Sequence, residues 1–176
     1  MITKNKTVIE EFIRLAKKFS NKTAIKTEHE QSSYSKILSQ LEIISNNLCH
    51  YCKKEKTLAI AMDRTILQII SILGCLKSDK SFIIFDEKIP LEKKRIIIKK
   101  LKIKTILADN SFKNIFKGVK VLKKKTFLKT NTRPFKVKAY KNNIVYYVFT
   151  SGSTGEPKGV QISNKNLLNF IFNCKK

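Results

Sequence analysis

The chain has 176 residues, of which 42% are hydrophobic, a size and composition that suit one globular domain with a substantial core and exclude a disordered chain. No stretch reaches the ~18 consecutive apolar residues that are needed to cross a bilayer, so we do not expect a membrane protein. With 37 Lys and Arg against 13 Asp and Glu, the formal net charge is +24, which raises nucleic-acid binding as a first alternative.

The positive charge comes almost entirely from lysine. There are 33 lysines and four arginines, and the densest region, Lys88 to Lys138, holds eighteen positive side chains beside only Glu92 and Asp109. Nucleic-acid recognition favours arginine, because its guanidinium makes bidentate and stacking contacts. We therefore interpret the lysines as solvated and do not expect a nucleic-acid partner. The first twelve residues lack the apolar segment of a secretory signal, so we expect a cytoplasmic protein.

The spacing of apolar residues predicts helices and strands in alternation along the chain. Helices are expected over 8–19, after the stretch SSYS with a face formed by Ile37, Leu41, Ile44 and Leu48, over 65–76, and from Pro90 to Leu101. Strands are expected over 23–27, 57–62, 81–86, 104–109 and 143–149. The basic stretch 111–143 has less clear order. Alternating strands and helices predict an α/β fold with a mainly parallel sheet and flanking helices.

The four cysteines are Cys49, Cys52, Cys75 and Cys174. The first two have the spacing of half a zinc site, but no second Cys or His pair follows, so we predict no metal site. Without a secretory signal, reduced and partly buried cysteines are expected. The two histidines have no partner pattern that suggests acid–base chemistry.

A glycine-rich segment follows the last predicted strand. The apolar run Ile144 to Phe149 leads into Thr150-Ser151-Gly152-Ser153-Thr154-Gly155, and Pro157 and Lys158 come directly afterwards. Glycine admits positive φ and a close approach of the backbone to a ligand. Hydroxyls, backbone amides and one ammonium that converge on a turn favour a phosphate group.

Two other interpretations of this segment compete with a phosphate site. A plain Ser/Gly surface loop needs no ligand, but it does not account for an ordered STGEPKG run directly behind a buried strand. A P-loop of the G-x-x-x-x-G-K-[ST] type is excluded, because Gly155 is followed by Glu156-Pro157-Lys158-Gly159 and no hydroxyl follows the lysine.

The run YVFTSGSTGEPKGV resembles the phosphate-loop signature of the adenylate-forming (AMP-binding) enzymes. SSYSKILSQLEIISNNL and LKSDKSFIIFDEKIPLEKKR resemble two earlier motifs of that superfamily in the same order, so the similarity extends from Val8 to Phe172. Within it the amino-acid-activating branch fits best. FDEKIPLEKKR and KGVQISNKNLLNF are most similar to D-alanine–D-alanyl carrier protein ligases, followed by peptide-synthetase adenylation domains.

The chain departs from the family pattern at a few positions. Ser78 and Asp79 replace the usual Ala-Gly, Ile84 replaces a proline, and Asn164 stands where many relatives have histidine. The resemblance implies that the first three positions pack strands and helices, so we expect these departures to affect stability more than chemistry.

The resemblance implies ATP-dependent adenylation of an amino acid, followed by transfer to a phosphopantetheinyl carrier-protein thiol, with ATP and Mg as cofactors. It assigns ATP binding to Thr150, Ser151, Gly152, Ser153, Thr154, Gly155 and Lys158. It assigns no catalytic residue and no metal ligand to this chain, because the family's later motifs have no counterpart in residues 1–176. We therefore expect these residues to form the N-terminal third of an adenylation domain, inactive alone, with the remaining two thirds absent. A non-catalytic remnant and a basic nucleic-acid-binding protein are the alternatives.

Overall fold

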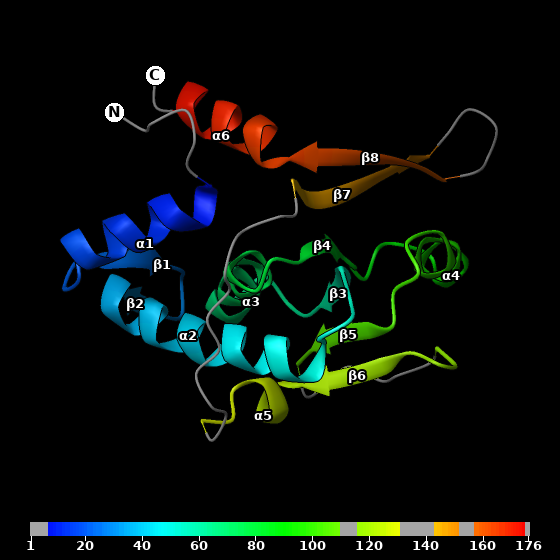
Figure 1. The fold of residues 1–176 in the computed structure, drawn as a ribbon, viewed down its shortest axis with the longest axis horizontal. Coiled ribbons are helices and arrows are strands. Elements are labelled where there is room, and N and C mark those ends of the chain that lie inside the picture. Colours follow the sequence, from blue (N-terminus) through cyan, green and yellow to red (C-terminus); the bar gives the residue numbers. More distant parts are fainter. Residues whose placement is uncertain (1–6, 110–115, 131–142, 152–156, 175–176) are drawn as a thin grey trace.

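The computed structural model describes residues 7–109, 116–130, 143–151 and 157–174, with the side chain of Ser151 excepted (Figure 1). Its helices are α1 Val8–Lys18, α2 Tyr34–Tyr51, α3 Ile66–Lys77, α4 Leu91–Lys100, α5 Lys124–Phe127 and α6 Asn164–Asn173. Its strands are β1 Thr23–Lys26, β2 Gln31–Ser33, β3 Thr57–Ala61, β4 Ser81–Ile84, β5 Thr105–Ala108, β6 Lys120–Lys123, β7 Ile144–Ser151 and β8 Pro157–Ser163.

The main sheet has six strands in the order β6-β5-β3-β4-β7-β8. All neighbours pair in parallel except β7 and β8, which form an antiparallel hairpin at one edge. β1 and β2 form a separate two-stranded ribbon. The predicted α/β class with a mainly parallel sheet is therefore confirmed.

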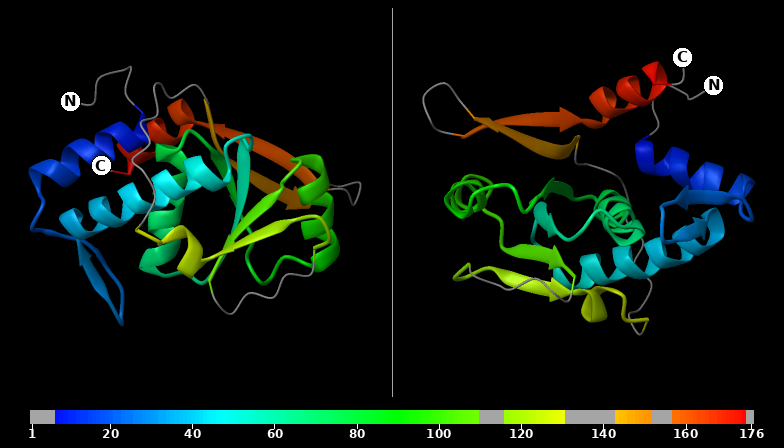
Figure 2. Two further views of the ribbon diagram at one scale, coloured as in Figure 1. Left: turned by 60° about the horizontal axis from the view of Figure 1, so that its bottom comes forward. Right: turned by 180° about the vertical axis from the view of Figure 1, so that it is seen from behind.

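Helices cover both faces of the sheet, with α2 and α3 on one side and α4 on the other (Figures 1 and 2). The first face buries Leu58, Ile60 and Leu107 against the apolar stripes of α2 and α3. The second buries alternate residues of the same strands, such as Ala59 and Ile106, against α4. Strand residues that are buried on both faces are typical of parallel sheets.

α2 and α3 pack unusually closely. A Cβ added at Gly74 of α3 would overlap Cγ2 of Ile44 on α2 and lie 3.3 Å from its Cβ. The glycine therefore sets the separation of the two helices, since a β-branched side chain in a helix has little rotamer freedom.

Local sequence signals explain where several helices begin. Thr7 and Glu10 form a reciprocal capping box at α1, and the Ser33 side chain accepts from Lys36 N at α2. Pro90 precedes the first turn of α4, as the sequence predicts.

Three strands were not predicted from the sequence. β2 and β6 are short, and β6 with α5 lies inside the basic stretch 111–143, whose order was less clear from the sequence. The burial of Leu122 and Phe127 places this stretch against the sheet, and Nδ2 of buried Asn47 donates to the carbonyl oxygens of Phe127 and Lys129, both at 2.9 Å. The stretch has few apolar side chains among many lysines, so the spacing of apolar residues does not reveal the strand or the helix in its sequence. β8 is mostly exposed, so it too lacks apolar alternation.

Among the described residues, no helix combines the length and the apolar character needed to cross a membrane.

Candidate functional site

The predicted phosphate loop lies at the tip of the β7–β8 hairpin. The two strands pair as far as Thr150 with Lys158 and Ser151 with Pro157, so residues 152–156 connect them. β7 therefore ends two residues later than the sequence predicted, because the ladder with β8 continues through Thr150 and Ser151. Four predicted site residues lie outside the described part of the chain: Gly152, Ser153, Thr154 and Gly155.

Two of the predicted phosphate-binding side chains are brought together by the register. Thr150 and Lys158 are directly opposite across the hairpin, and both are exposed. Side chains of paired residues point to the same face and have Cβ atoms about 4.5–5.5 Å apart. A hydroxyl and an ammonium thus flank the mouth of the connection, where both can reach a bound anion.

Phe149 and Gly159 form the next pair below Thr150 and Lys158 and face each other across the strands. A Cβ at Gly159 would lie 2.8 Å from Cζ of the Phe149 ring. This glycine therefore makes room for an aromatic ring. From the sequence, glycines in this segment were expected only to let a phosphate approach the backbone. The role of Gly159 was missed because it depends on which residue of β7 pairs with it.

Helix α4 supports the hairpin from the other side. Nζ of Lys100 donates to the carbonyl oxygen of Pro157 at 3.2 Å, and Pro157 itself is buried. A pocket of about 200 Å³ beside Thr150 is also lined by Lys88 and Lys93 at the start of α4. The site therefore has three lysines near the loop mouth that the sequence motif does not include.

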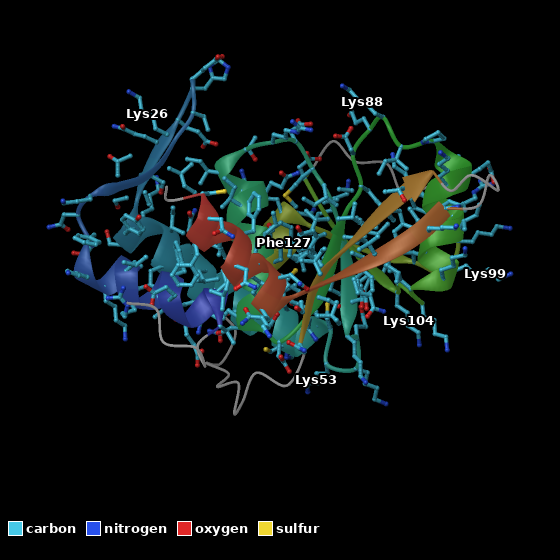
Figure 3. The ribbon with its side chains drawn as sticks, turned by 90° about the horizontal axis from the view of Figure 1, so that it is seen from above. Lys26, Lys53, Lys88, Lys99, Lys104 and Phe127 are labelled. Carbon is cyan, nitrogen blue, oxygen red and sulfur yellow. The ribbon has the colours of Figure 1, made fainter. Side chains whose placement is uncertain are left out.

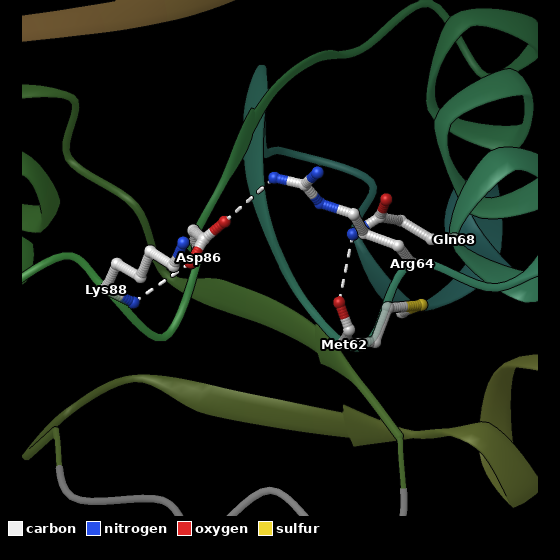
Figure 4. Close-up of polar contacts among 5 residues, drawn as sticks. All are labelled: Met62, Arg64, Gln68, Asp86 and Lys88. Carbon is white, nitrogen blue, oxygen red and sulfur yellow. Dashed lines mark hydrogen bonds and ion pairs between the residues drawn. The ribbon is translucent and has the colours of Figure 1, made fainter.

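A larger crevice, of about 840 Å³, lies outside the carboxyl ends of the parallel strands β3, β4 and β5. Asp86 stands in its wall, with Oδ1 accepting from Lys88 N at 2.9 Å and Oδ2 3.3 Å from Nη2 of Arg64 (Figure 4). The Lys88 amide, aided by the Arg64 guanidinium, holds the pKa of the Asp86 carboxyl below its ordinary value. Asp86 thus shapes the turn that leads into α4, which is a structural role.

The departures from the family pattern have structural explanations. Asp79 has φ +57°, in the left-handed region that glycine occupies most easily, and Ser78 Oγ donates to the carbonyl oxygens of Gly74 and Cys75 at 2.8 and 3.0 Å. Asn164 Oδ1 accepts from Val8 N at 3.0 Å and joins the start of α6 to the start of α1.

The cysteines do not form a metal centre in the described part of the chain, where no three Cys, His, Asp or Glu side chains gather. All four thiols are free, and only Cys174 is exposed. Burial raises the pKa of the Cys49 and Cys75 thiols above the ordinary value and that of Cys52 to about 11.

The sheet and the loop together define the class of protein. Strand β8 follows the glycine-rich segment of this chain, whereas a helix follows the glycine-rich segment of a P-loop. The hairpin carries the run YVFTSGSTGEPKGV, whose sequence resembles the phosphate-loop signature of the adenylate-forming enzymes. The family model "AMP-binding enzyme" matches residues 12–176, and the chain belongs to this family.

The similar curated proteins are large peptide synthetases. Gramicidin S synthase 2 of Brevibacillus brevis is 27% identical over 175 residues, which cover 95% of this chain and 4% of that protein. The chain therefore spans only a small part of the relatives that it matches.

Two similar solved structures come from Klebsiella oxytoca. The NpsA N-terminal subdomain in complex with 3-hydroxyanthranilyl-AMSN has a TM-score of 0.78 and 20% identity, covering 90% of this chain and 41% of that one. NpsA-ThdA, an artificially fused adenylation-PCP di-domain, has a TM-score of 0.78 and covers 93% of this chain and 34% of that one. At this identity the likeness shows a shared fold.

Proposed function

We propose that this chain supplies the ATP phosphate-binding loop of an enzyme that converts an amino-acid carboxylate into its adenylate and passes the aminoacyl group to a carrier-protein thiol. The observation that carries the proposal is the hairpin itself, in which Thr150 and Lys158 face each other at the mouth of a connection made of glycines and hydroxyls. Membership of the AMP-binding family and similarity to peptide synthetases support the reaction class.

In the proposed reaction, a carboxylate oxygen attacks the α-phosphorus of ATP, and the bond to the bridging oxygen breaks to release pyrophosphate. The loop's task is to hold the β- and γ-phosphates in line while negative charge develops on the leaving group. Lys158 neutralises this charge, and Thr150, Ser151, Ser153 and Thr154 donate hydrogen bonds. Gly152 and Gly155 admit the phosphates close to the backbone.

Residues 1–176 are, in this proposal, the N-terminal portion of an adenylation domain. The relatives extend far beyond the matched region, and the fused adenylation-PCP structure supports a carrier protein as the acyl acceptor. The resemblance places the pocket that selects the amino acid in the remaining portion, so the similarity to D-alanine–carrier protein ligases names a branch of the family and not a substrate. The resemblance also implies magnesium, but no three Cys, His, Asp or Glu side chains gather in the described part of the chain to hold it.

The test is amino-acid-dependent exchange of pyrophosphate into ATP, with and without the remaining portion of an adenylation domain supplied in cis or in trans. We expect residues 1–176 alone to give no exchange. In the completed enzyme, Gly155→Val should abolish most of the exchange with little change in melting temperature, because a side chain there blocks phosphate approach.

Lys158→Ala serves as the milder partner variant. Losing one exposed charge-assisted hydrogen bond should lower the rate about ten- to hundredfold without changing amino-acid preference. If Gly155→Val lowers only the melting temperature and leaves the rate of the folded enzyme unchanged, the loop is not a phosphate site. Exchange by residues 1–176 alone would also contradict the proposal, and exchange that never appears in a folded completed enzyme would favour the non-catalytic remnant.

A further inference from the structure

The end of the β7–β8 hairpin extends past the strand beside it (Figure 1). One residue pair is registered between β4 and β7, namely Phe82 with Tyr146, whose ring centroids lie 5.6 Å apart in a stacked arrangement. β4 ends two residues after Phe82, whereas β7 continues for five residues after Tyr146, as far as Ser151. At about 3.3 Å per residue, the end of β7 therefore reaches about 10 Å beyond β4. Pairing with β4 cannot hold this end of the hairpin in place.

One face of α4 lies opposite this end of the hairpin (Figures 1 and 2). Lys93, Ile97 and Lys100 follow one another at spacings of four and three residues, so they share a face of the helix. Ile97 is buried in the core against which Phe149 packs, and both side chains line the pocket of about 200 Å³ between α4 and the hairpin. The face that carries Lys100 is therefore the one turned toward the hairpin.

Lys100 joins α4 to the hairpin at the residue where β8 begins. Its Nζ donates to the carbonyl oxygen of Pro157 at 3.2 Å. Pro157 pairs with Ser151 at the end of the ladder, but a proline has no N–H with which to donate a hydrogen bond to β7. A groove of about 540 Å³, lined by Lys100 and Pro157 among others, separates the end of α4 from the hairpin. The lysine thus holds the hairpin where both the ladder and the packing are weakest.

The phosphate-binding side chains point away from α4. Successive side chains of a strand alternate between its faces, so Thr150 and Lys158 lie on the face opposite to that of Phe149 and Gly159. Phe149 faces the core beside α4. Lys100 therefore acts on the backbone of the hairpin, and the phosphates bind on the other side.

We propose that Lys100 is a positioning residue for the phosphate loop, because its bond to Pro157 fixes where the mouth of the loop stands relative to the sheet. This inference rests on the proposed function. Thr150 and Lys158 form the adjacent pair of the ladder, so a hairpin that swings away from α4 carries both side chains with it. In-line transfer tolerates little misplacement, since an error of about 1 Å can cost a hundredfold in rate.

The first experiment measures amide hydrogen exchange in residues 1–176 without ATP. Lys100→Met removes the donor but keeps the length and the helix propensity of the side chain. We expect exchange in residues 158–161 to become about three- to tenfold faster, whereas exchange in β3 and β5, which reports an intact fold, should not change.

Lys99→Met is the matched control for this experiment. Lys99 belongs to the same turn of α4 but points outward, so its substitution removes the same charge without touching the hairpin (Figure 3). Exchange in residues 158–161 should stay at the wild-type rate in this variant. Equal rates in Lys100→Met and Lys99→Met overturn the proposal.

The second experiment separates positioning from a merely structural role, in the completed enzyme. We expect Lys100→Met to raise the KM for ATP about three- to tenfold and to leave the KM for the amino acid unchanged. Lys100→Arg keeps a donor and should restore most of the wild-type value. Faster amide exchange with an unchanged KM for ATP would mean that Lys100 only stabilises the hairpin, and this result also overturns the proposal.

A failure of the proposed function gives a different result. A completed enzyme that folds but gives no pyrophosphate exchange contradicts the proposed function. The amide exchange of residues 158–161 in the free chain is measured without any reaction, so it then decides by itself whether Lys100 holds the hairpin.

Discussion

Two residues of the described chain adopt the left-handed backbone conformation without being glycine, namely Asp79 with φ +57° and Lys102 with φ +51°. Each follows the end of a helix, where glycine is the usual residue because it has no Cβ to crowd the backbone. Asp79 stands where the family pattern has glycine, and its left-handed backbone supports the expectation that this departure affects stability more than chemistry.

We expect Asp79→Gly to raise the free energy of unfolding by about 0.5–1 kcal/mol, because glycine removes the left-handed strain. Lys102→Gly should act in the same direction. Lys99→Gly, inside α4, is the matched control and should lower stability by about 1 kcal/mol. Urea unfolding measures the free energy of unfolding of all three variants, and any loss of stability for Asp79→Gly would contradict the argument.

The thiols differ sharply in their surroundings. Cys174 is exposed at the end of α6, whereas Cys49, Cys52 and Cys75 are buried and have raised pKa values. At pH 8 we expect one thiol to react rapidly with a disulfide reagent in the native protein and three more only on unfolding. Cys174→Ser should abolish the rapid reaction.

The raised pKa of Cys52 also predicts a pH dependence. Its thiol titrates at about 11 in the folded protein against an ordinary value of 9.0, so the folded state retains the proton more tightly. The contribution of the protonated Cys52 thiol to the free energy of unfolding is complete below pH 9, and it is lost as the pH rises toward 11. The difference in unfolding free energy between the wild type and Cys52→Ala should therefore narrow over that range. A constant difference would show that the thiol is not desolvated.

At the scale of elements, the contact of α2 with α3 leaves no room for a larger side chain at Gly74. Gly74→Ala gains helix propensity of about 1 kcal/mol but forces a methyl group into Ile44. Because Ile44 is fully buried and stiff, we expect overpacking to prevail and the free energy of unfolding to fall by about 1–2 kcal/mol net.

A double-mutant cycle isolates this effect. With Ile44→Ala in place, the obstructing methyl group is gone, and Gly74→Ala should become neutral or stabilising. Equal losses in both backgrounds would show that the glycine matters for some reason other than its contact with Ile44.

At the scale of the whole molecule, the net charge of +24 is spread over the surface. Lys26, Lys53, Lys88, Lys99 and Lys104 point outward on different sides (Figure 3). Lys80 is an exception, since it is buried and its Nζ donates to the carbonyl oxygens of Cys52 and Glu55 at 2.6 and 2.7 Å. Lys80 thus joins the segment that follows α2 to the residue before β4, whereas the five lysines named above remain available to counterions.

We therefore expect binding to DNA or RNA to be weak, independent of sequence and abolished by moderate salt. Scattered lysines bind nucleic acid only by displacing counterions from its phosphates, which depends on the salt concentration and not on the base sequence. Fluorescence anisotropy with unrelated oligonucleotides across a salt series measures it. Tight and selective binding at physiological ionic strength would favour the nucleic-acid alternative instead.

The sequence by itself determined the alternation of strands and helices, the α/β class and the family. These follow from local periodicity, from capping residues such as Pro90 and from the uninterrupted run around Gly152 and Gly155, all of which act within a few residues.

The tertiary structure alone decided the rest. The order of the strands, the register that sets Thr150 opposite Lys158, the ring of Phe149 over Gly159 and the bond from Lys100 to Pro157 join residues that are distant or on different elements. The short strand β6 and the exposed strand β8 also escaped prediction, because pairing with neighbouring strands, and not their own apolar pattern, keeps them extended.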